Sequence, residues 1–518
     1  MSDENGYLDD QENGKFELAP KEIERSDSAA ELSSSQDGIV YIHGARFWLI
    51  CVAIAIIMFL VNLEVPVVIT ALVAITNELQ GFDDVGWVVA SYLLGYVGVI
   101  VICAKFSDIF GRKLLFLSSI VFFIIFSAAC SASQTIVQLI IFRAFQGIGG
   151  GGCWSLATII VVELVPPRAI CQPSVPIAIP ALIISFLFIP KDFPYQGQPN
   201  YKSKSFKDLI AKSTLDRIDI PGTILILFAT LAITAAFEEA DKKFPWRSAY
   251  VITLLTLSGF LWIGLAIWER YVTLSNTVRE PILPWRFLFN REMMGVLLNF
   301  VLLGGPTVIC MFILPQRFQL VYGTSGLGAG VRLIPFTAVI PVGSIFASIL
   351  AGKFKIPPIY LLILGSVLQV LGFALIGTLP STLSIPDRIY GFQILAGWGC
   401  GINFSLLFIL IPFYNEKRDH AVALGAGSQF RFMGGSIVLA ISTSVFNSYV
   451  QPRLGSQLGV SDPDALIAIL PTLPQAIQEQ ARHILAVGYS HQILVLAVSA
   501  GLQIPATLLM WKKKQLRI

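Results

Sequence analysis

Long, uninterrupted apolar runs are the feature of this sequence that most constrains its fold. They recur from residue 47 to residue 511, and most reach the roughly 20 residues that a helix needs to cross a bilayer. Lipid offers the backbone no hydrogen-bond partner, so only helices and closed barrels can span it. The runs are too long and continuous for barrel strands. The sequence therefore predicts an all-α membrane protein.

Composition excludes several other classes of protein. The chain is 55% hydrophobic and only 13% charged, whereas about a quarter of the residues of a soluble domain are charged. Its net charge of +3 is too small to indicate a nucleic-acid partner. The seven cysteines are scattered without metal-ligand spacing, and no nucleophile–base set stands out. We therefore expect no metal, no cofactor and no enzyme activity.

About thirteen runs qualify as spans. We place them near 47–73, 85–104, 114–133, 136–164, 174–190, 219–237, 249–270, 292–315, 329–352, 358–379, 388–412, 421–447 and 487–511. Residues 1–46 are polar and acidic and have no signal-peptide pattern, which predicts a disordered cytosolic tail. We expect 448–486 to form an extracellular loop with a short amphipathic helix, and 512–518 to form a basic cytosolic tail.

The basic loops near the two ends of the chain disagree by one membrane crossing. Lys and Arg in short loops mark the cytoplasmic side, which places the loop after the second span and Arg168 inside. A single crossing at 174–190 would then put the basic loop 191–218 outside, although later basic loops favour the inside. We infer that one helix is missing near Pro167–Pro173, through a deletion or an altered splice or gene model. A miscounted span, or a re-entrant element at 165–180, would also explain the difference.

Ionisable side chains within apolar spans are costly and indicate function. Glu64 lies deep in the first run, where it could take up and release protons, or could be a structural carboxyl paired with a basic side chain. Arg143 in the fourth run needs a partner or water, and Gln146 could orient it. Arg431 is a second intramembrane arginine. Glu64, Arg143 and Arg431 are therefore the proton-coupling candidates.

The loop sequence "CAKFSDIFGRK" (103–113) predicts a gate on the cytoplasmic face. Gly111 permits a tight turn, and Asp108 can pair with Arg112 or accept from a helix N-terminus. With Lys113, these residues could latch one helical bundle against the other. The alternative is a plain solvated basic loop.

Further residues suggest helix packing and ligand binding. The glycines at 147 and 149–152 allow another helix to approach closely, and packing is their main interpretation. Amide and aromatic side chains in spans suit a large, mostly apolar ligand, although ordinary packing would explain each aromatic. The substrate-binding candidates are Gln146, Gln393, Trp398, Phe404, Gln429 and Phe430.

Three motifs resemble the major facilitator superfamily. "AKFSDIFGRK" is similar to its loop signature, Gly-x-Leu-Ala-Asp-x-x-Gly-Arg-Lys, with Ala104 replacing the first glycine. "RAFQGIGGG" resembles the fourth-helix signature. "NLEVPVVITALVAI" resembles the first helix of fourteen-span drug:proton antiporters, with Glu64 where Asp is usual and Pro66 where Thr is common. Within that family, the motifs resemble those of fungal toxin and multidrug efflux carriers.

The resemblance implies two six-helix bundles with an inserted helix pair. It also implies a fifth helix with a Gly-Pro-Gly-Gly signature, and no such stretch exists between Pro167 and Ile183. This segment instead resembles the fourth helix of the family joined almost directly to the sixth. The basic loops, which place the two ends of the chain one crossing apart, lead to the same interpretation. The expected units are an N-terminal bundle of about five spans at 47–190, a basic cytosolic loop at 191–218, an inserted pair at 219–270 and a C-terminal six-helix bundle at 292–511.

The favoured function is export of small amphipathic compounds, such as drugs, toxins or secondary metabolites, in exchange for protons. Its expected partners are the bilayer, protons and a small-molecule substrate, and we expect a monomer in the plasma membrane or, alternatively, the vacuolar membrane. An uptake carrier for a siderophore or nutrient would have the same features. Because of the missing helix, a transport-incompetent remnant is a further alternative, and comparison of transcript with genome around codon 168 would distinguish it.

Overall fold

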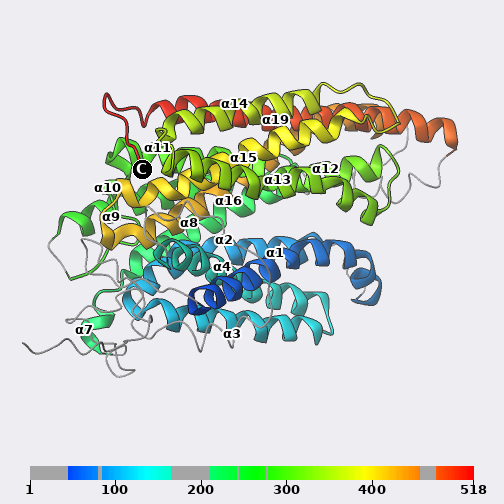
Figure 1. The fold of residues 1–518 in the computed structure, drawn as a ribbon. Helices are drawn as coiled ribbons and strands as arrows, with labels where there is room; N and C mark the ends of the chain where they lie inside the picture. The colour runs from blue at the N-terminus through cyan, green and yellow to red at the C-terminus, as the bar shows by residue number, and fades with distance from the viewer. Residues whose placement is uncertain (1–44, 80–84, 165–210, 242–243, 276–277, 456–473) are drawn as a thin grey trace, which may run out of the picture.

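The structure is a computed structural model that describes residues 45–79, 85–164, 211–241, 244–275, 278–455 and 474–518. These residues are almost entirely helical. Figure 1 shows long helices running roughly parallel, with the blue-to-cyan N-terminal helices in one layer and most of the green-to-red helices in another. The predicted all-α architecture is confirmed.

Four helices form the N-terminal group. They are α1 (Ala45–Leu79), α2 (Val85–Phe110), α3 (Arg112–Ser131) and α4 (Ile136–Leu164). Gly111 alone separates α2 from α3, and its φ of 98° lies in the left-handed region that glycine adopts without steric cost. Because α4 packs against α1, α2 and α3, it is the helix on which this group is assembled.

Close contact between α2 and α4 depends on the glycine run. A Cβ atom at Gly147 would lie 2.1 Å from the carbonyl oxygen of Tyr92, and one at Gly151 would lie 2.2 Å from that of Tyr96. These distances leave no space for a side chain, since backbone atoms cannot rotate away. Packing is therefore sufficient to explain these two glycines.

The two helices predicted as an insertion, for which we keep the name inserted pair, are α8 (Ile220–Glu239) and α9 (Ala249–Leu274), preceded by the short α7 (Lys212–Leu215). Asp219 caps α8, because its Oδ1 accepts from the Gly222 amide at 3.2 Å. The same oxygen accepts from the Trp268 indole of α9 at 2.8 Å, which ties the two helices together. Beyond α9, α8 also packs against α2 and against α16 of the C-terminal group.

The C-terminal group contains the remaining helices. They are α10 (Arg286–Phe289), α11 (Arg291–Gly304), α12 (Cys310–Leu320), α13 (Gly326–Gly352), α14 (Pro358–Gly377), α15 (Arg388–Tyr414), α16 (His420–Val450) and α19 (Gln475–Leu508). A π-helical turn, η2 (Gly305–Ile309), contains Pro306 and joins α11 to α12. The short turns η3 (Lys417–Asp419) and η4 (Gln451–Gly455) flank α16.

Eleven helical stretches in the described part of the chain are long and apolar enough to cross a membrane. Each overlaps an expected span, and a shorter apolar stretch, Phe47–Asn62, lies within α1. The expected span at 174–190 and the missing helix inferred near Pro167–Pro173 lie outside the described residues, as does most of the tail 1–46.

The last span differs from its expected boundary. α19 begins at Gln475, whereas the apolar run predicted a span only from 487. The polar residues from 475 to 486 have helical backbone geometry and extend the same helix beyond its apolar part. Of the loop expected at 448–486, residues 456–473 lie outside the described residues.

Candidate functional site

The ionisable residues of the N-terminal spans meet in one cluster. Nη1 of Arg143 in α4 donates to Oε1 of Glu64 in α1 at 2.6 Å and to Oε1 of Gln146 at 2.9 Å. Nε of Arg143 donates to the Val88 carbonyl oxygen of α2 at 3.2 Å, and its guanidinium carbon lies 4.5 Å from the centre of the Tyr92 ring. Three helices thus hold one carboxylate–guanidinium pair.

The two members of this pair differ in access to solvent. The Arg143 side chain is 1% exposed, whereas that of Glu64 is 23% exposed. Glu64 lines a cavity of about 520 Å³ between α1 and α3, together with Phe123, Ser127 and Ser131. A carboxylate at the edge of a cavity can exchange a proton while its buried partner stays in place. The carboxylate of Glu64 is therefore both paired with Arg143 and accessible from the cavity.

Arg431 occupies a different environment, between the N-terminal and C-terminal groups. Its guanidinium carbon lies 5.4 Å from the ring centre of Trp154 in α4 and 5.1 Å from that of Phe404 in α15. The neighbouring Phe432 ring is 4.4 Å away and packs edge-to-face on Tyr96 of α2 at 5.0 Å. Arg431 is therefore enclosed by rings from both groups.

These rings offset only part of the cost of burying Arg431. A cation–π contact contributes about 0.5–2 kcal/mol, whereas removing an ion from water costs several kcal/mol. Arg431 is 6% exposed, and no carboxylate among the described residues forms an ion pair with it. Arg143, in contrast, is neutralised by Glu64 at 2.6 Å.

Two of the predicted gating residues, Asp108 and Arg112, form ion pairs within the N-terminal group of helices. Arg112 pairs with Asp108 one turn earlier at 2.6 Å and with Glu163 at the end of α4 at 2.8 Å. Glu163 was not among the sequence-predicted residues, although it is an acidic residue at the end of an apolar run. The contacts of Arg112 fasten α2, α3 and α4 together, and they do not reach the C-terminal group.

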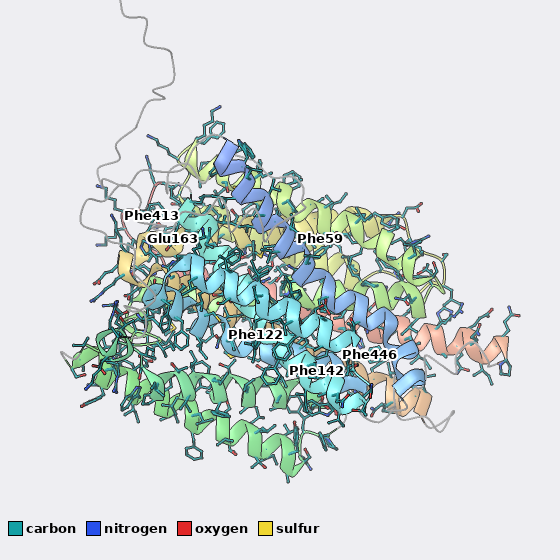
Figure 2. The ribbon with its side chains drawn as sticks, turned by 90° about the horizontal axis from the view of Figure 1, so that it is seen from below. Phe59, Phe122, Phe142, Glu163, Phe413 and Phe446 are labelled. Carbon is teal, nitrogen blue, oxygen red and sulfur yellow. The ribbon has the colours of Figure 1, made fainter. Side chains whose placement is uncertain are left out.

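This cluster lies at one end of the molecule. Figure 2 places Glu163 and Phe413 toward the same end, with Phe142 and Phe446 toward the other. The C-terminus, α7 and α10 also lie at the Glu163 end, which is on the left of Figure 1. Because short basic loops gather at the cytoplasmic face, we expect this end to be cytoplasmic.

Comparison with known proteins agrees with this arrangement. The family model described as Major Facilitator Superfamily matches residues 50–171, which contain Glu64, Arg112 and Arg143. A protein described as MFS-type transporter FPY5, from Fusarium mangiferae, is 34% identical over 96% of this chain and 87% of its own length. The chain belongs to the major facilitator superfamily.

Other relatives of this facilitator have more specific names. Multidrug resistance protein 3 of Bacillus subtilis is 28% identical over 76% of this chain and 79% of its own length. Efflux pump aunC of Aspergillus niger is 24% identical over 95% of this chain and 91% of its own length. A solved bacterial homologue of the human lysosomal transporter Spinster, inward-facing and occupied, has a TM-score of 0.53 at 13% identity, covering 91% of this chain and 100% of that one. That likeness shows the fold.

Two of the substrate-binding candidates of this facilitator face the inserted pair. Gln429 accepts from the Val101 amide of α2 at 3.0 Å and donates to the Thr230 hydroxyl of α8 at 2.8 Å. Phe430 stacks on Trp262 of α9 at 5.9 Å. These contacts tie α16 to three other helices, so a packing role is enough to account for both residues.

The other candidates fall into two places. Gln146 and Phe404 contact the two intramembrane arginines. Gln393 and Trp398 lie on α15, and the Trp398 ring packs edge-to-face on Phe346 at 5.5 Å. Neither amide atom of Gln393 nor the indole nitrogen of Trp398 has a hydrogen-bond partner in the described part of the facilitator. The six candidates thus do not form one site in this structure.

One charged cluster was missed by sequence reasoning. Nζ of Lys105 in α2 donates to Oε2 of Glu280 at 2.6 Å, and Nε of Arg217 donates to Oε1 of Glu280 at 2.8 Å. Arg217 precedes α8 and Glu280 follows α9, so the cluster joins α2 to both ends of the inserted pair. We call these three residues the loop clamp. An acidic residue isolated within basic loops was the signal that could have revealed it.

The loop clamp sets the ionisation of Glu280. Burial favours the neutral carboxyl, but the charges of Lys105 and Arg217 and their hydrogen bonds outweigh it, so the pKa of Glu280 lies below its ordinary value. Glu280 is therefore ionised at neutral pH, where it can bind both cations.

Proposed function

We propose that this facilitator exports small amphipathic compounds in exchange for protons, by alternating access of its two helical bundles. The Glu64–Arg143 ion pair is the observation that supports the proposal most directly. Protonation of Glu64 cancels the pair while Arg143 keeps its bonds to Gln146 and Val88. Proton occupancy is thereby coupled to the packing of α1 against α4, which are the helices that hold the two charges.

The names of the relatives support export over uptake. One relative is described as a multidrug resistance protein and another as an efflux pump. A drug or metabolite that reaches the cytosol is removed most simply across the plasma membrane, with the vacuolar membrane as the alternative. We propose the plasma membrane as the site of action.

Reconstituted protein tests both the coupling and the direction. Liposomes containing the purified protein receive ethidium or 1-pyrenebutanoate, a cationic and an anionic amphipathic dye. An antiporter accumulates its dye only when the lumen is more acidic than the bath, whereas a proton-coupled uptake carrier requires the opposite gradient. Failure to transport either dye under both gradients would support the alternative of a transport-incompetent chain.

Glu64→Gln tests the proposed role of the carboxylate. The amide cannot release a proton at neutral pH, so we expect gradient-driven accumulation of dye to fall at least tenfold. The matched control is Glu479→Gln, which removes an exposed carboxylate at the start of α19 and is expected to change nothing. Uphill transport that continues in Glu64→Gln would show that the proton acts elsewhere.

A further inference from the structure

Two buried hydrogen-bond donors without acceptors meet between the halves of this molecule. Arg431 is 6% exposed and Trp154 is 8% exposed. Nε of Arg431 and Nε1 of Trp154 have no hydrogen-bond partner among the residues that the structure describes. The guanidinium carbon of Arg431 lies 5.4 Å from the Trp154 ring centre. Buried polar groups are nearly always hydrogen-bonded, so two adjacent exceptions point to an absent acceptor.

Arg431 differs from the other buried arginines because it combines the lack of a carboxylate partner in the described ranges with a position between the two groups of helices. Arg112 and Arg143 each form ion pairs with carboxylates, at 2.8 Å and 2.6 Å. Arg317 has no carboxylate partner in the described ranges, but it lies within the C-terminal group and donates to the Ile376 carbonyl oxygen at 3.3 Å. Arg431 instead lies at the boundary between the groups, where a ligand could supply the missing negative charge.

The surroundings of Arg431 suit the apolar part of such a ligand. The Phe404 ring lies 5.1 Å from the guanidinium carbon, and the Phe432 ring lies 4.4 Å from it. Phe432 also packs edge-to-face on Trp154 at 5.8 Å, which links rings of α16 and α4. Movement of the two groups relative to each other would open this aromatic cluster to one side of the membrane at a time.

A guanidinium group stays protonated in proteins, so it cannot take up and release a proton during transport. Its paired N–H groups match the two oxygens of a carboxylate, and the resulting hydrogen bonds are charge-assisted. We propose that Arg431 binds the carboxylate of the transported compound, with the Trp154 N–H as a second donor and the rings of Phe404 and Phe432 around its apolar body. The substrates are then amphipathic organic acids, an assignment that rests on the proposed transport function.

Binding of a matched series of pyrene probes tests this site. The full chain in nanodiscs is titrated with 1-pyrenebutanoate, its methyl ester and 1-pyrenemethylamine, and energy transfer from tryptophan reports binding after subtraction of empty nanodiscs. We expect the wild-type protein to bind the carboxylate at least tenfold more tightly than the ester or the amine. Equal binding of acid and ester by the wild-type protein would overturn the proposal, and this comparison needs no variant.

Variants test which residues are responsible for the preference for the carboxylate probe. Arg431→Gln is expected to weaken binding of the carboxylate at least tenfold and that of the ester less than twofold, while Arg431→Lys keeps part of the preference. Trp154→Phe keeps a ring but removes the donor, and should weaken the carboxylate about threefold. The control Arg317→Gln removes another buried arginine and should keep the preference. A preference that survives in Arg431→Gln contradicts the assignment.

The binding assay also separates this inference from the transport proposal. It uses no pH gradient, so Glu64→Gln should still prefer the carboxylate even though it cannot drive accumulation. A wild-type protein that prefers the carboxylate but transports nothing supports the Arg431 site and contradicts export. Active transport of ethidium, with no preference for the carboxylate, supports export and contradicts the Arg431 site.

Discussion

The contact between α2 and α4 leaves no space for a side chain at two positions of α4. Gly147 and Gly151 have carbonyl oxygens of α2 where a Cβ atom would be, at 2.1 Å and 2.2 Å. Gly259 of α9 is the opposite case, since a Cβ atom added there would meet no neighbouring side chain or helix within 4 Å. The same residue type therefore has different physical roles in two apolar helices.

Replacing Gly151 with alanine should destabilise the protein by about 1–3 kcal/mol, because the opposing backbone of α2 must shift to accept the methyl group. Gly259→Ala is the matched control, and it should be neutral or stabilising by up to about 1 kcal/mol through helix propensity. Thermal unfolding in detergent, followed by intrinsic fluorescence, measures both. Equal unfolding temperatures for the two variants would contradict the close approach of α2 and α4.

The intramembrane charges show how far residue-level reasoning extends. The cost of burying an ion made Glu64, Arg143 and Arg431 recognisable from their positions within apolar runs. Sequence could not determine which of them pair, because Glu64 and Arg143 are 79 positions apart. It also grouped Arg431 with the proton-coupling candidates, whereas its aromatic surroundings lead us to propose an anion-binding role.

At the scale of helices, the inserted pair is attached to both the N-terminal and the C-terminal groups, more closely than a peripheral helix pair would require. α8 packs against α2 and α16, and the loop clamp attaches both ends of the pair to α2. The loop after α9 is anchored a second time, because the amides of Ile282 and Leu283 donate to Oε1 of Glu269 at 3.1 Å and 3.2 Å. We therefore expect movement of α2 to be transmitted to these loops.

Loss of the Glu280 charge should release the loop clamp. The Glu280 amide donates to the Arg217 carbonyl oxygen at 3.0 Å, so we expect Glu280→Gln to speed hydrogen exchange at this amide several-fold. Acidification should act in the same direction. Since the pKa of Glu280 is lowered in the folded protein, its contribution is present at neutral pH and is lost as the pH falls below the ordinary glutamate range and through that lowered value.

Hydrogen exchange with mass spectrometry at several pH values measures the effect, with intrinsic exchange rates subtracted. Glu416→Gln is the control, because Glu416 is 62% exposed and its ion pairs with Arg286 and Arg418 lie at the surface. Exchange at Glu280 that is unchanged by Glu280→Gln would mean that the backbone alone holds this loop.

For the molecule as a whole, the approach of α2 to α16 joins the N-terminal and C-terminal groups near the gating loop. A Cβ atom at Gly425 would lie 2.6 Å from the Cβ atom of Ala104. Ala104 occupies the position of a glycine in the superfamily signature, and the opposing glycine makes room for its methyl group. Alternating access by rocking of two bundles requires this contact to open.

A disulfide across this contact should arrest transport. The Cβ atoms of a disulfide lie about 3.8 Å apart, so Ala104→Cys combined with Gly425→Cys needs only a small separation of the helices. We expect oxidation of the double variant to reduce dye transport in liposomes at least tenfold, and reduction to restore it. Each single variant controls for the native cysteines. Full activity in a crosslinked double variant, verified by peptide mapping, would mean that α2 and α16 do not separate.

The missing helix stays a prediction for the chain as a whole. It rests on the basic loops, because each crossing reverses the side of the membrane on which a loop emerges. The alignment with FPY5 runs over 534 positions while covering 96% of a chain of 518 residues, so the relative has residues that this chain lacks.

The sequence alone determined the helical membrane architecture, the approximate positions of the spans in the described part of the chain, and three of its intramembrane charges, Glu64, Arg143 and Arg431. These follow from local properties, since apolar length and the cost of an ion in lipid act at each segment separately. Only the tertiary structure decided that Glu64 meets Arg143, that Arg112 binds Glu163, that Glu280 closes the loop clamp and that aromatic rings surround Arg431. Such contacts join residues from different helices, and their geometry depends on how whole helices pack.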